Sequence, residues 1–168
     1  MSWWDRLGEL FVAAARDDAP MPEARTAPPV EPDIEQIAAE YATPHFKWSE
    51  LECKGDCAGC SYAIDAGGPV RYIQAEALDR LEALRVELNK PLIVNSAARC
   101  PRHNASVGGA PRSQHRSTED SPSTAFDIRL TLPKEELIAA AERCGFKGIG
   151  ANYKTFVHID NRSRRARW

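Results

Sequence analysis

Residues 125–129 read AFDIR and residues 156–160 read FVHID, and these two segments decide the fold. Apolar residues alternate with polar ones in both, which is the period of a β-strand with one buried face. Asp127 therefore points to the opposite face from Phe126 and Ile128. A lone strand histidine such as His158 is more often a hydrogen-bonded core residue than a metal ligand, so this pattern indicates strands and leaves their function open.

Helices and further short strands are predicted around these two segments. The apolar spacing is that of amphipathic helices and buried strands, and a proline stands at the favourable first turn of the third helix. The predicted elements are helices over 34–41, 74–89 and 133–144 and strands over 92–94, 125–131 and 155–160. Gly145, Gly148 and Gly150 are expected to mark turns. Because the chain has no repeat and no regular βαβ alternation, the expected class is α+β.

The N-terminal part of the chain is predicted to be separate from the domain over 34–168. Residues 1–18 have the spacing of an amphipathic helix, and residues 19–33 contain five of the twelve prolines, which is typical of an extended linker. The first helix either packs on its own domain or docks on a partner protein, and both alternatives stay open. Its acidic polar face disfavours binding to a membrane surface.

The composition excludes several classes of protein. The 168-residue chain is 43% hydrophobic and 27% charged, with a formal charge of −2, as in soluble globular proteins. This charge gives no reason to expect nucleic acid as a partner, and the arginines between 162 and 167 are interpreted as a solubilising basic tail. No apolar stretch reaches the ~20 residues of a membrane span, and no secretory signal is recognisable. We therefore expect synthesis in the cytoplasm.

Several longer blocks of the sequence closely resemble the zinc D-alanyl-D-alanine carboxypeptidase-like peptidases. The blocks are NSAARCPRHN at 95–104, VGGAPRSQH at 107–115, TAFDIR at 124–129, GFKGIG at 145–150 and FVHID at 156–160. They occur in the order of that family and cover about residues 44–168. The resemblance implies a hedgehog/DD-peptidase-like domain, in which a small antiparallel sheet is flanked by helices.

The same resemblance implies a zinc site. The motif of the family, S-x-H-x-x-G-x-A-x-D, matches at His115 and Asp127, and the later histidine of the family matches His158, so these three residues are the expected zinc ligands. Such a set leaves a fourth position for the water that attacks the substrate. Arg99 is implied at the cleft, where a guanidinium can polarise the scissile carbonyl or bind a substrate carboxylate. A buried ion pair at the strand end is the alternative for Arg99.

The chain departs from the family motif in two places. Eleven residues separate His115 from Asp127 where the motif has six, and the insertion falls in 116–123. Such a loop can bulge outward, or it can reshape the substrate cleft. No acidic residue stands just before His158, so Asp160 is the first candidate for a general base or for an orienting partner of the histidine. A salt bridge from Asp160 to an arginine is the alternative, and the acidic pair at 119–120 is a weaker candidate for the base.

A cysteine run precedes the matching blocks. The segment CKGDCAGC at 53–60 places Cys53, Cys57 and Cys60 at the spacing of radical iron–sulfur enzymes, but the chain lacks the βα repeats that would enclose their substrate. A structural zinc with a fourth ligand from Cys100 or a histidine and a loop of unligated thiols both stay open. Cys100 and Cys144 are expected to be buried, His103 to lie at the surface or at a helix cap, and His45 to lie in a polar lead-in.

The expected function is zinc-dependent hydrolysis of peptide bonds in peptidoglycan stem peptides, by carboxypeptidase or endopeptidase action. Relatives without a signal sequence are often phage-encoded, as endolysins or virion components, and the N-terminal helix and linker are typical of a tethered enzyme that acts at the bacterial cell wall. The rival hypothesis is an inactive structural or wall-binding module of the same fold, docked in a larger assembly through the N-terminal helix.

Overall fold

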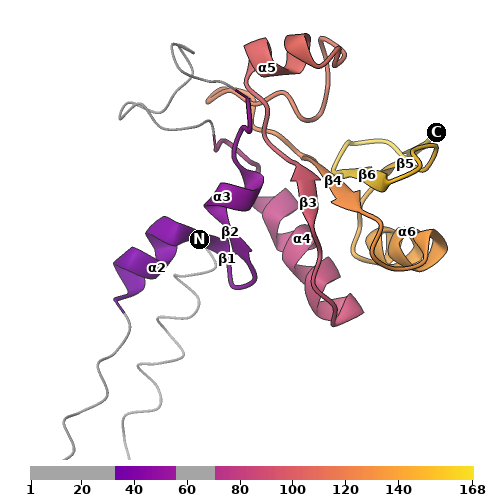
Figure 1. Ribbon diagram of the computed structural model, residues 1–168, viewed down its shortest axis with the longest axis horizontal. Helices are drawn as coiled ribbons and strands as arrows, with labels where there is room; N and C mark the ends of the chain where they lie inside the picture. Colours follow the sequence, from indigo (N-terminus) through magenta and orange to yellow (C-terminus); the bar gives the residue numbers. More distant parts are fainter. Residues whose placement is uncertain (1–32, 56–70) are drawn as a thin grey trace, which may run out of the picture.

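The computed structural model describes residues 33–55 and 71–168 (Figure 1). The expected helix over 1–18, all of the expected linker except Asp33, and the thiols of Cys57 and Cys60 lie outside these residues. Asp33 is the N-cap of the first described helix, α2 (Ile34–Glu40), because its carboxylate accepts hydrogen bonds from the backbone N–H groups of Glu35 and Gln36.

A five-stranded sheet lies at the centre of the domain, with the strands in the order β3-β4-β6-β5-β7. The strands are β3 (Val94–Ser96), β4 (Ala125–Arg129), β5 (Gly148–Gly150), β6 (Phe156–Asp160) and β7 (Ala166–Arg167). Neighbouring strands run antiparallel except β5 and β7, which pair in parallel at one edge. The expected α+β class and the small antiparallel sheet are confirmed, with this parallel pair as an addition.

Two helices cover one face of the sheet (Figure 1). These are α4 (Ala75–Leu88) and α6 (Lys134–Arg143), and α4 ends where Asn89 adopts a left-handed conformation, with φ at 46°. Their buried leucines pack against the apolar residues of β4, β5 and β6 in one continuous core. The members that are less than 2% exposed and bulky include Phe46, Phe126, Leu51, Leu81, Leu84, Ile128, Leu137, Ile149, Ile159 and Val157. The apolar face of β4, β5 and β6 is thus buried in the core, and the polar face of these strands is not part of it.

A short N-terminal unit is attached to α4 by a buried carboxylate. The unit consists of α2, the hairpin of β1 (Tyr41–Thr43) and β2 (Phe46–Lys47), and α3 (Trp48–Leu51). Glu82 of α4 is only 1% exposed, and it accepts a hydrogen bond of 2.7 Å from the hydroxyl of Thr43 and contacts the ring of His45. Because a buried carboxylate needs such partners, this contact fixes the hairpin on the helix. The ring of His45 is thereby occupied by a structural contact.

The helices predicted over 34–41, 74–89 and 133–144 agree with the structure to within one residue at each end, and the strand predicted over 125–131 ends two residues earlier, at Arg129. Two other expectations about strands were wrong. The strand expected over 92–94 begins only at Val94, because pairing with β4, and not apolar character, sets where the ladder forms. Gly148 and Gly150 were expected to mark turns, yet they lie in β5 and face the bulky side chains of β6. Among the residues that the structure describes, no helix is long and apolar enough to cross a lipid bilayer.

Candidate metal centre

The strand register brings Asp127 and His158 together. The two residues are directly opposite each other in the antiparallel pair of β4 and β6. Since opposite residues of such a pair point to the same face, both side chains lie on the polar face of the sheet. Nδ1 of His158 lies 2.9 Å from Oδ1 of Asp127. Gly150 stands beside His158 on β5, where a Cβ atom would lie 2.9 Å from that of the histidine, so the glycine makes room for the imidazole.

His115 reaches the same point from a loop. Its backbone carbonyl accepts a 2.8 Å hydrogen bond from the N–H of Arg99, which holds the loop against the chain that follows β3. On the imidazole, Nδ1 lies 2.7 Å from the backbone oxygen of Ala97. Nε2 lies 3.1 Å from Oδ1 of Asp127 and 3.1 Å from Nδ1 of His158. The three expected ligands therefore converge, and all three are buried.

The three converging atoms have the chemistry of a cation site. The other ring nitrogen of each histidine faces an oxygen, which accepts its proton: Ala97 O for His115, and Oδ2 of Asp160 for His158, at 3.0 Å. The nitrogens that face Asp127 therefore present lone pairs toward a carboxylate oxygen. Three buried acceptors without a shared donor are unfavourable unless a cation lies between them. Ligands about 2.0–2.2 Å from a tetrahedral zinc lie about 3.3–3.6 Å apart, a few tenths of an ångström more than the 2.9–3.1 Å here. The residues fit zinc.

Asp160 lies behind His158 and is held there by Arg162. Its carboxylate is fully buried and receives hydrogen bonds from Nε of Arg162 at 2.8 Å, from Nη2 at 2.6 Å and from the backbone N–H at 2.9 Å. A Cβ atom at Gly148 would lie 2.3 Å from this carboxylate, so only glycine fits there. Both the arginine salt bridge and the orienting contact to His158 that the sequence left open are present, and Asp160 lines no part of the cleft.

Arg99 contacts Asp127 from the other side. Its Nη2 lies 2.6 Å from Oδ2 of Asp127, and its Nε donates to the hydroxyl of Ser96 at 2.8 Å. Asp127 thus directs one oxygen to the histidines and the other to the guanidinium. The side chain of Arg99 is 16% exposed and lines the cleft. The two alternatives that the sequence left open for Arg99, an ion pair at the strand end and a position at the cleft, therefore occur together.

The electrostatic environment keeps both carboxyl groups ionised. Burial opposes a charge on Asp127, but the neighbouring imidazoles of His115 and His158 outweigh it and hold the pKa of this carboxyl well below its usual range. Burial likewise opposes a charge on Asp160, and hydrogen bonds from Arg162 and His158 outweigh it and lower its pKa. Burial lowers the pKa of His115. Burial also acts to lower the pKa of His158, yet its two carboxylate partners reverse the sign and raise it.

A cleft of about 480 Å³ opens above the three converging side chains. Arg99, Arg112 and Arg162 line it, as do three aromatic side chains, Tyr153, Phe156 and Trp168. Tyr153 stacks on Phe156 with ring centroids 4.2 Å apart, and the ring of Trp168 lies 5.4 Å from that of His158 and 4.6 Å from the guanidinium carbon of Arg162. Within the described part of the chain, Asp127 is the only carboxylate among the lining residues. The cleft is therefore basic and partly aromatic.

Arg162 and Trp168 are site residues that the sequence analysis did not identify. The C-terminal arginines were expected to form one solubilising tail, whereas the chain turns back so that the backbone N–H of Trp168 donates to the carbonyl oxygen of Ile149 at 3.1 Å and the ring reaches the cleft. The two-residue spacing from Asp160 to Arg162 was an available signal for the salt bridge. The position of Trp168 has no such local signal, because it depends on the pairing of β7 with β5.

The insertion over 116–123 bulges outward with both ends anchored. Ser117 and Ser123 are fully buried, and each contacts the backbone of Tyr72 through a hydrogen bond. Glu119 and Asp120 lie at the exposed tip, and the cleft is lined by neither. Within the described residues, the insertion therefore adds no side chain to the cleft lining, and the acidic pair considered for the base lies outside that lining.

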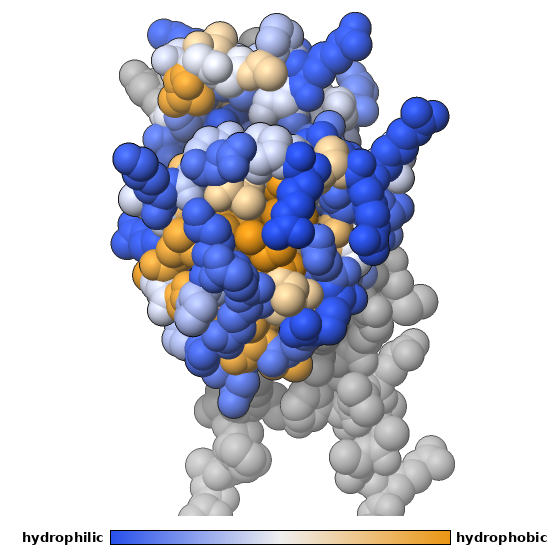
Figure 2. All heavy atoms as spheres, turned by 90° about the vertical axis from the view of Figure 1, so that its right-hand side faces the viewer, coloured by the Kyte–Doolittle hydropathy of each residue, from blue (hydrophilic) through white to orange (hydrophobic). Residues whose placement is uncertain are grey.

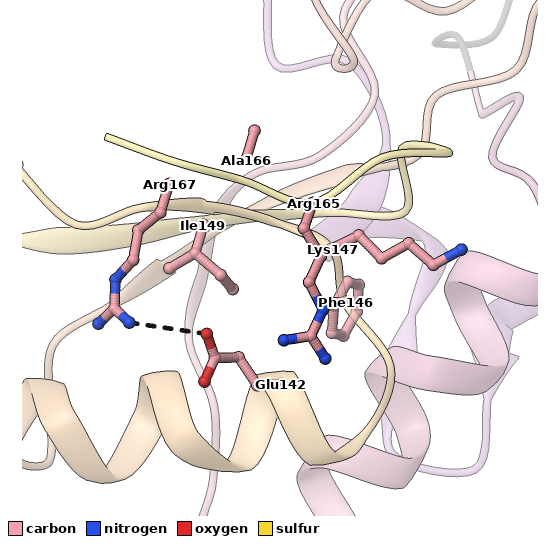
Figure 3. A pocket seen from close by; sticks show the side chains of 7 residues that line it. All are labelled: Glu142, Phe146, Lys147, Ile149, Arg165, Ala166 and Arg167. Atoms are coloured by element: carbon pink, nitrogen blue, oxygen red, sulfur yellow. Dashed lines mark ion pairs between the residues drawn. The ribbon is translucent and has the colours of Figure 1, made fainter.

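A smaller hollow of about 280 Å³ lies between α6 and the edge of the sheet (Figure 3). Its floor contains Phe146 and Ile149, and its rim carries Lys147, Arg165 and an ion pair of 3.6 Å between Arg167 and Glu142. The space-filling view of this side shows hydrophobic residues surrounded by hydrophilic ones (Figure 2). With a single carboxylate and no histidine in its lining, this hollow has no metal-binding set comparable to that of the larger cleft.

Comparison with known proteins agrees with this geometry. No curated protein shows detectable sequence similarity to the chain. Among protein families, the model of Peptidase M15 matches residues 44–160, a range that contains all three converging side chains together with Arg99 and Asp160. Because this match covers more than half of the chain, the protein belongs to the Peptidase M15 family, whose members are zinc peptidases.

Proposed function

We propose that this peptidase cleaves peptide bonds in the stem peptides of bacterial peptidoglycan, with His115, Asp127 and His158 as its zinc ligands. The observation that carries the proposal is the convergence of their three acceptor atoms, 2.9–3.1 Å apart, at the floor of a basic cleft. Stem peptides carry free carboxylates, and the three arginines of the lining supply the complementary charge.

Zinc, when bound, supplies Lewis acidity, which makes water nucleophilic near neutral pH and polarises a carbonyl group. The side chains of the protein hold and orient the zinc ligands. Asp127 keeps one oxygen toward the histidines because Arg99 binds the other, and Ala97 O and Asp160 fix which ring nitrogen of each histidine carries the proton. These contacts preorganise the ligand set before the substrate arrives.

Arg99 is placed to stabilise negative charge on the substrate. A guanidinium has five N–H groups, and the contacts to Asp127 and Ser96 occupy two of them. The partly exposed remainder lies in the lining, where N–H groups can donate to the oxygen of the scissile carbonyl as charge develops on it. Asp160 acts instead as a positioning residue, because it is buried behind His158 and its lowered pKa makes it a weak proton acceptor.

A second candidate function is an inactive module that keeps the fold and the metal. The observation in its favour is that Asp127 is the one carboxylate of the described cleft lining, so an acidic general base is lacking there.

Attachment to a phage particle or a lytic role at the cell wall is proposed from the sequence of residues 1–33 alone, which falls outside the described residues except for Asp33.

Digestion of purified peptidoglycan tests the proposal. The full chain with zinc should release peptide fragments that chromatography and mass spectrometry resolve, and His115→Ala and His158→Ala should abolish release together with zinc at this site. Arg99→Lys should keep the zinc and lose about 100-fold in rate, since lysine cannot hold Asp127 and donate to the substrate together. A zinc-loaded wild type that leaves peptidoglycan intact would instead support the inactive module.

A further inference from the structure

The indole of Trp168 packs against an expected metal ligand and against the arginine behind it. Its ring centroid lies 5.4 Å from that of His158, with 46° between the ring planes, and 4.6 Å from the guanidinium carbon of Arg162. A Cβ atom at Gly150 would lie 2.9 Å from the Cβ of His158 and 3.1 Å from Cε2 and Nε1 of the indole. The imidazole and the indole therefore share the space that this glycine leaves on the sheet.

Backbone hydrogen bonds hold Trp168 at this point. Its N–H donates to the carbonyl oxygen of Ile149 at 3.1 Å, and its carbonyl oxygen accepts a hydrogen bond of 2.6 Å from the N–H of Ala151. These two bonds continue the parallel pairing of β7 with β5 and place Trp168 beside Gly150. The residue is 38% exposed, so part of the indole lines the cleft while the rest is in contact with the sheet.

The residues that the indole contacts belong to one chain of hydrogen bonds. Nη2 of Arg162 donates to Oδ2 of Asp160 at 2.6 Å, and the same oxygen lies 3.0 Å from Nε2 of His158. Nδ1 of His158 is one of the three converging atoms of the metal centre. Asp160 is fully buried, whereas the side chains of His158 and Arg162 are 10% and 30% exposed. Water can therefore reach this chain at its two ends, and the indole lies against both of them.

We propose that Trp168 is a positioning residue of the metal centre, which holds His158 in the orientation that binds zinc. Contact with the indole restricts rotation of the imidazole, and the cation–π contact keeps the guanidinium of Arg162 on Asp160. Because the indole excludes water from both ends, the hydrogen bond between His158 and Asp160 is stronger and the imidazole is a better ligand. This role rests on the zinc site of the proposed function and is independent of the substrate.

Zinc affinity, measured by competition with a chelator, tests this role. Trp168→Leu keeps the backbone hydrogen bonds and an apolar side chain but removes the aromatic ring, so we expect about 10-fold weaker zinc binding than in wild type. Trp168→Phe restores an aromatic ring and should recover most of the affinity. Tyr153→Leu is the matched control. Tyr153 is 40% exposed and lines the same cleft, but it stacks on Phe156 and not on a metal ligand, so this variant should bind zinc as wild type does.

Unfolding of the metal-free variants in denaturant separates positioning from packing. A tryptophan that only stabilised the fold would lower the midpoint of unfolding when it is replaced and would leave the zinc affinity of the folded protein unchanged. Equal zinc affinity in wild type, Trp168→Leu and Trp168→Phe therefore overturns the positioning role and leaves the zinc site in place. If His158→Ala removes no zinc from the protein, the zinc site itself is wrong, and the role of Trp168 is wrong with it.

Cobalt quenching gives a second readout, which needs only the conservative variant. Because the indole contacts a metal ligand, Co²⁺ bound in place of zinc should quench part of the tryptophan fluorescence of wild type. Trp168→Phe should lose this part of the quenching. Quenching of equal size in wild type and Trp168→Phe would show that the indole lies away from the metal in solution, and the proposal would then be wrong.

Discussion

The two histidines of the metal centre are held in different ways, one by a sheet and one by a loop. His158 lies in a central strand, where the register with β4 sets its position and a buried carboxylate orients its ring. His115 lies in a loop, where the backbone carbonyl of Ala97 orients its ring and its own backbone carbonyl accepts a hydrogen bond from the N–H of Arg99. The sheet side is fixed by many cooperative contacts, and the loop side depends on a few, so we expect the two sides to respond differently to mutation.

Asp127 is the residue on which both sides converge, and its removal should have the largest effect. Asp127→Ala leaves two imidazoles without their shared anion and Arg99 without its partner, so we expect loss of zinc from this site and of hydrolysis below detection. Metal analysis and peptidoglycan digestion measure both. Asp33→Ala, which removes only the cap of α2, should keep zinc and activity; zinc retained at this site in Asp127→Ala would contradict the assignment.

Removal of the carboxylate behind His158 weakens the sheet side alone. Asp160→Asn should lower zinc affinity by about 10-fold to 100-fold, because the asparagine no longer provides an anion to the Nε2 proton of His158. Competition with a chelator of known affinity gives the value. If Asp160 were the general base, the variant would bind zinc as tightly as wild type and would lose its activity, so the two roles give different results.

Paired glycine substitutions compare the rigidity of the two sides. Gly148→Ala places a Cβ 2.3 Å from the carboxylate of Asp160, within the sheet, and Gly109→Ala places one 2.3 Å from Oδ1 of Asn104, beside the cleft. We expect Gly148→Ala to reduce the free energy of unfolding by about 1–3 kcal/mol, since Arg162 and His158 hold the carboxylate that would have to move. We expect Gly109→Ala to cost less because the loop backbone can shift away from Asn104, whose backbone oxygen would lie 2.9 Å from the added Cβ. Denaturant unfolding measures both. Equal losses would show that the two sides are equally rigid.

The tip of the inserted loop should matter least. Glu119→Gln combined with Asp120→Asn changes two exposed residues outside the cleft lining, so stability should stay within about 0.5 kcal/mol of wild type, with zinc content and hydrolysis unchanged. Thermal unfolding measures the change in stability, and the digestion assay measures the change in hydrolysis. A large loss of hydrolysis would mean that the acidic pair reaches the substrate after all.

The local pattern of apolar residues predicted the helices and strands of this protein well and the contacts between its side chains poorly. The helix that contains Leu81 and Leu84 and the strands around Asp127 and His158 follow from the spacing of apolar residues, since that spacing reports which face is buried. The strand of Gly148 and Gly150 was missed because glycine usually marks turns. Here its lack of a side chain is required by Asp160 and His158 in the next strand, which no local pattern reports.

The sequence by itself determined the α+β class and the three residues that converge in the structure, and it showed the resemblance to zinc peptidases. The reason is that the alternation of apolar and polar residues and the spacing of motifs can be read from the chain without its fold. Only the tertiary structure decided that Asp160 is locked behind His158, that Arg99 bonds Asp127, and that Trp168 returns to the cleft. Those contacts join residues far apart in the chain or depend on which way a buried side chain is turned. Both are set by strand pairing and packing rather than by local preference.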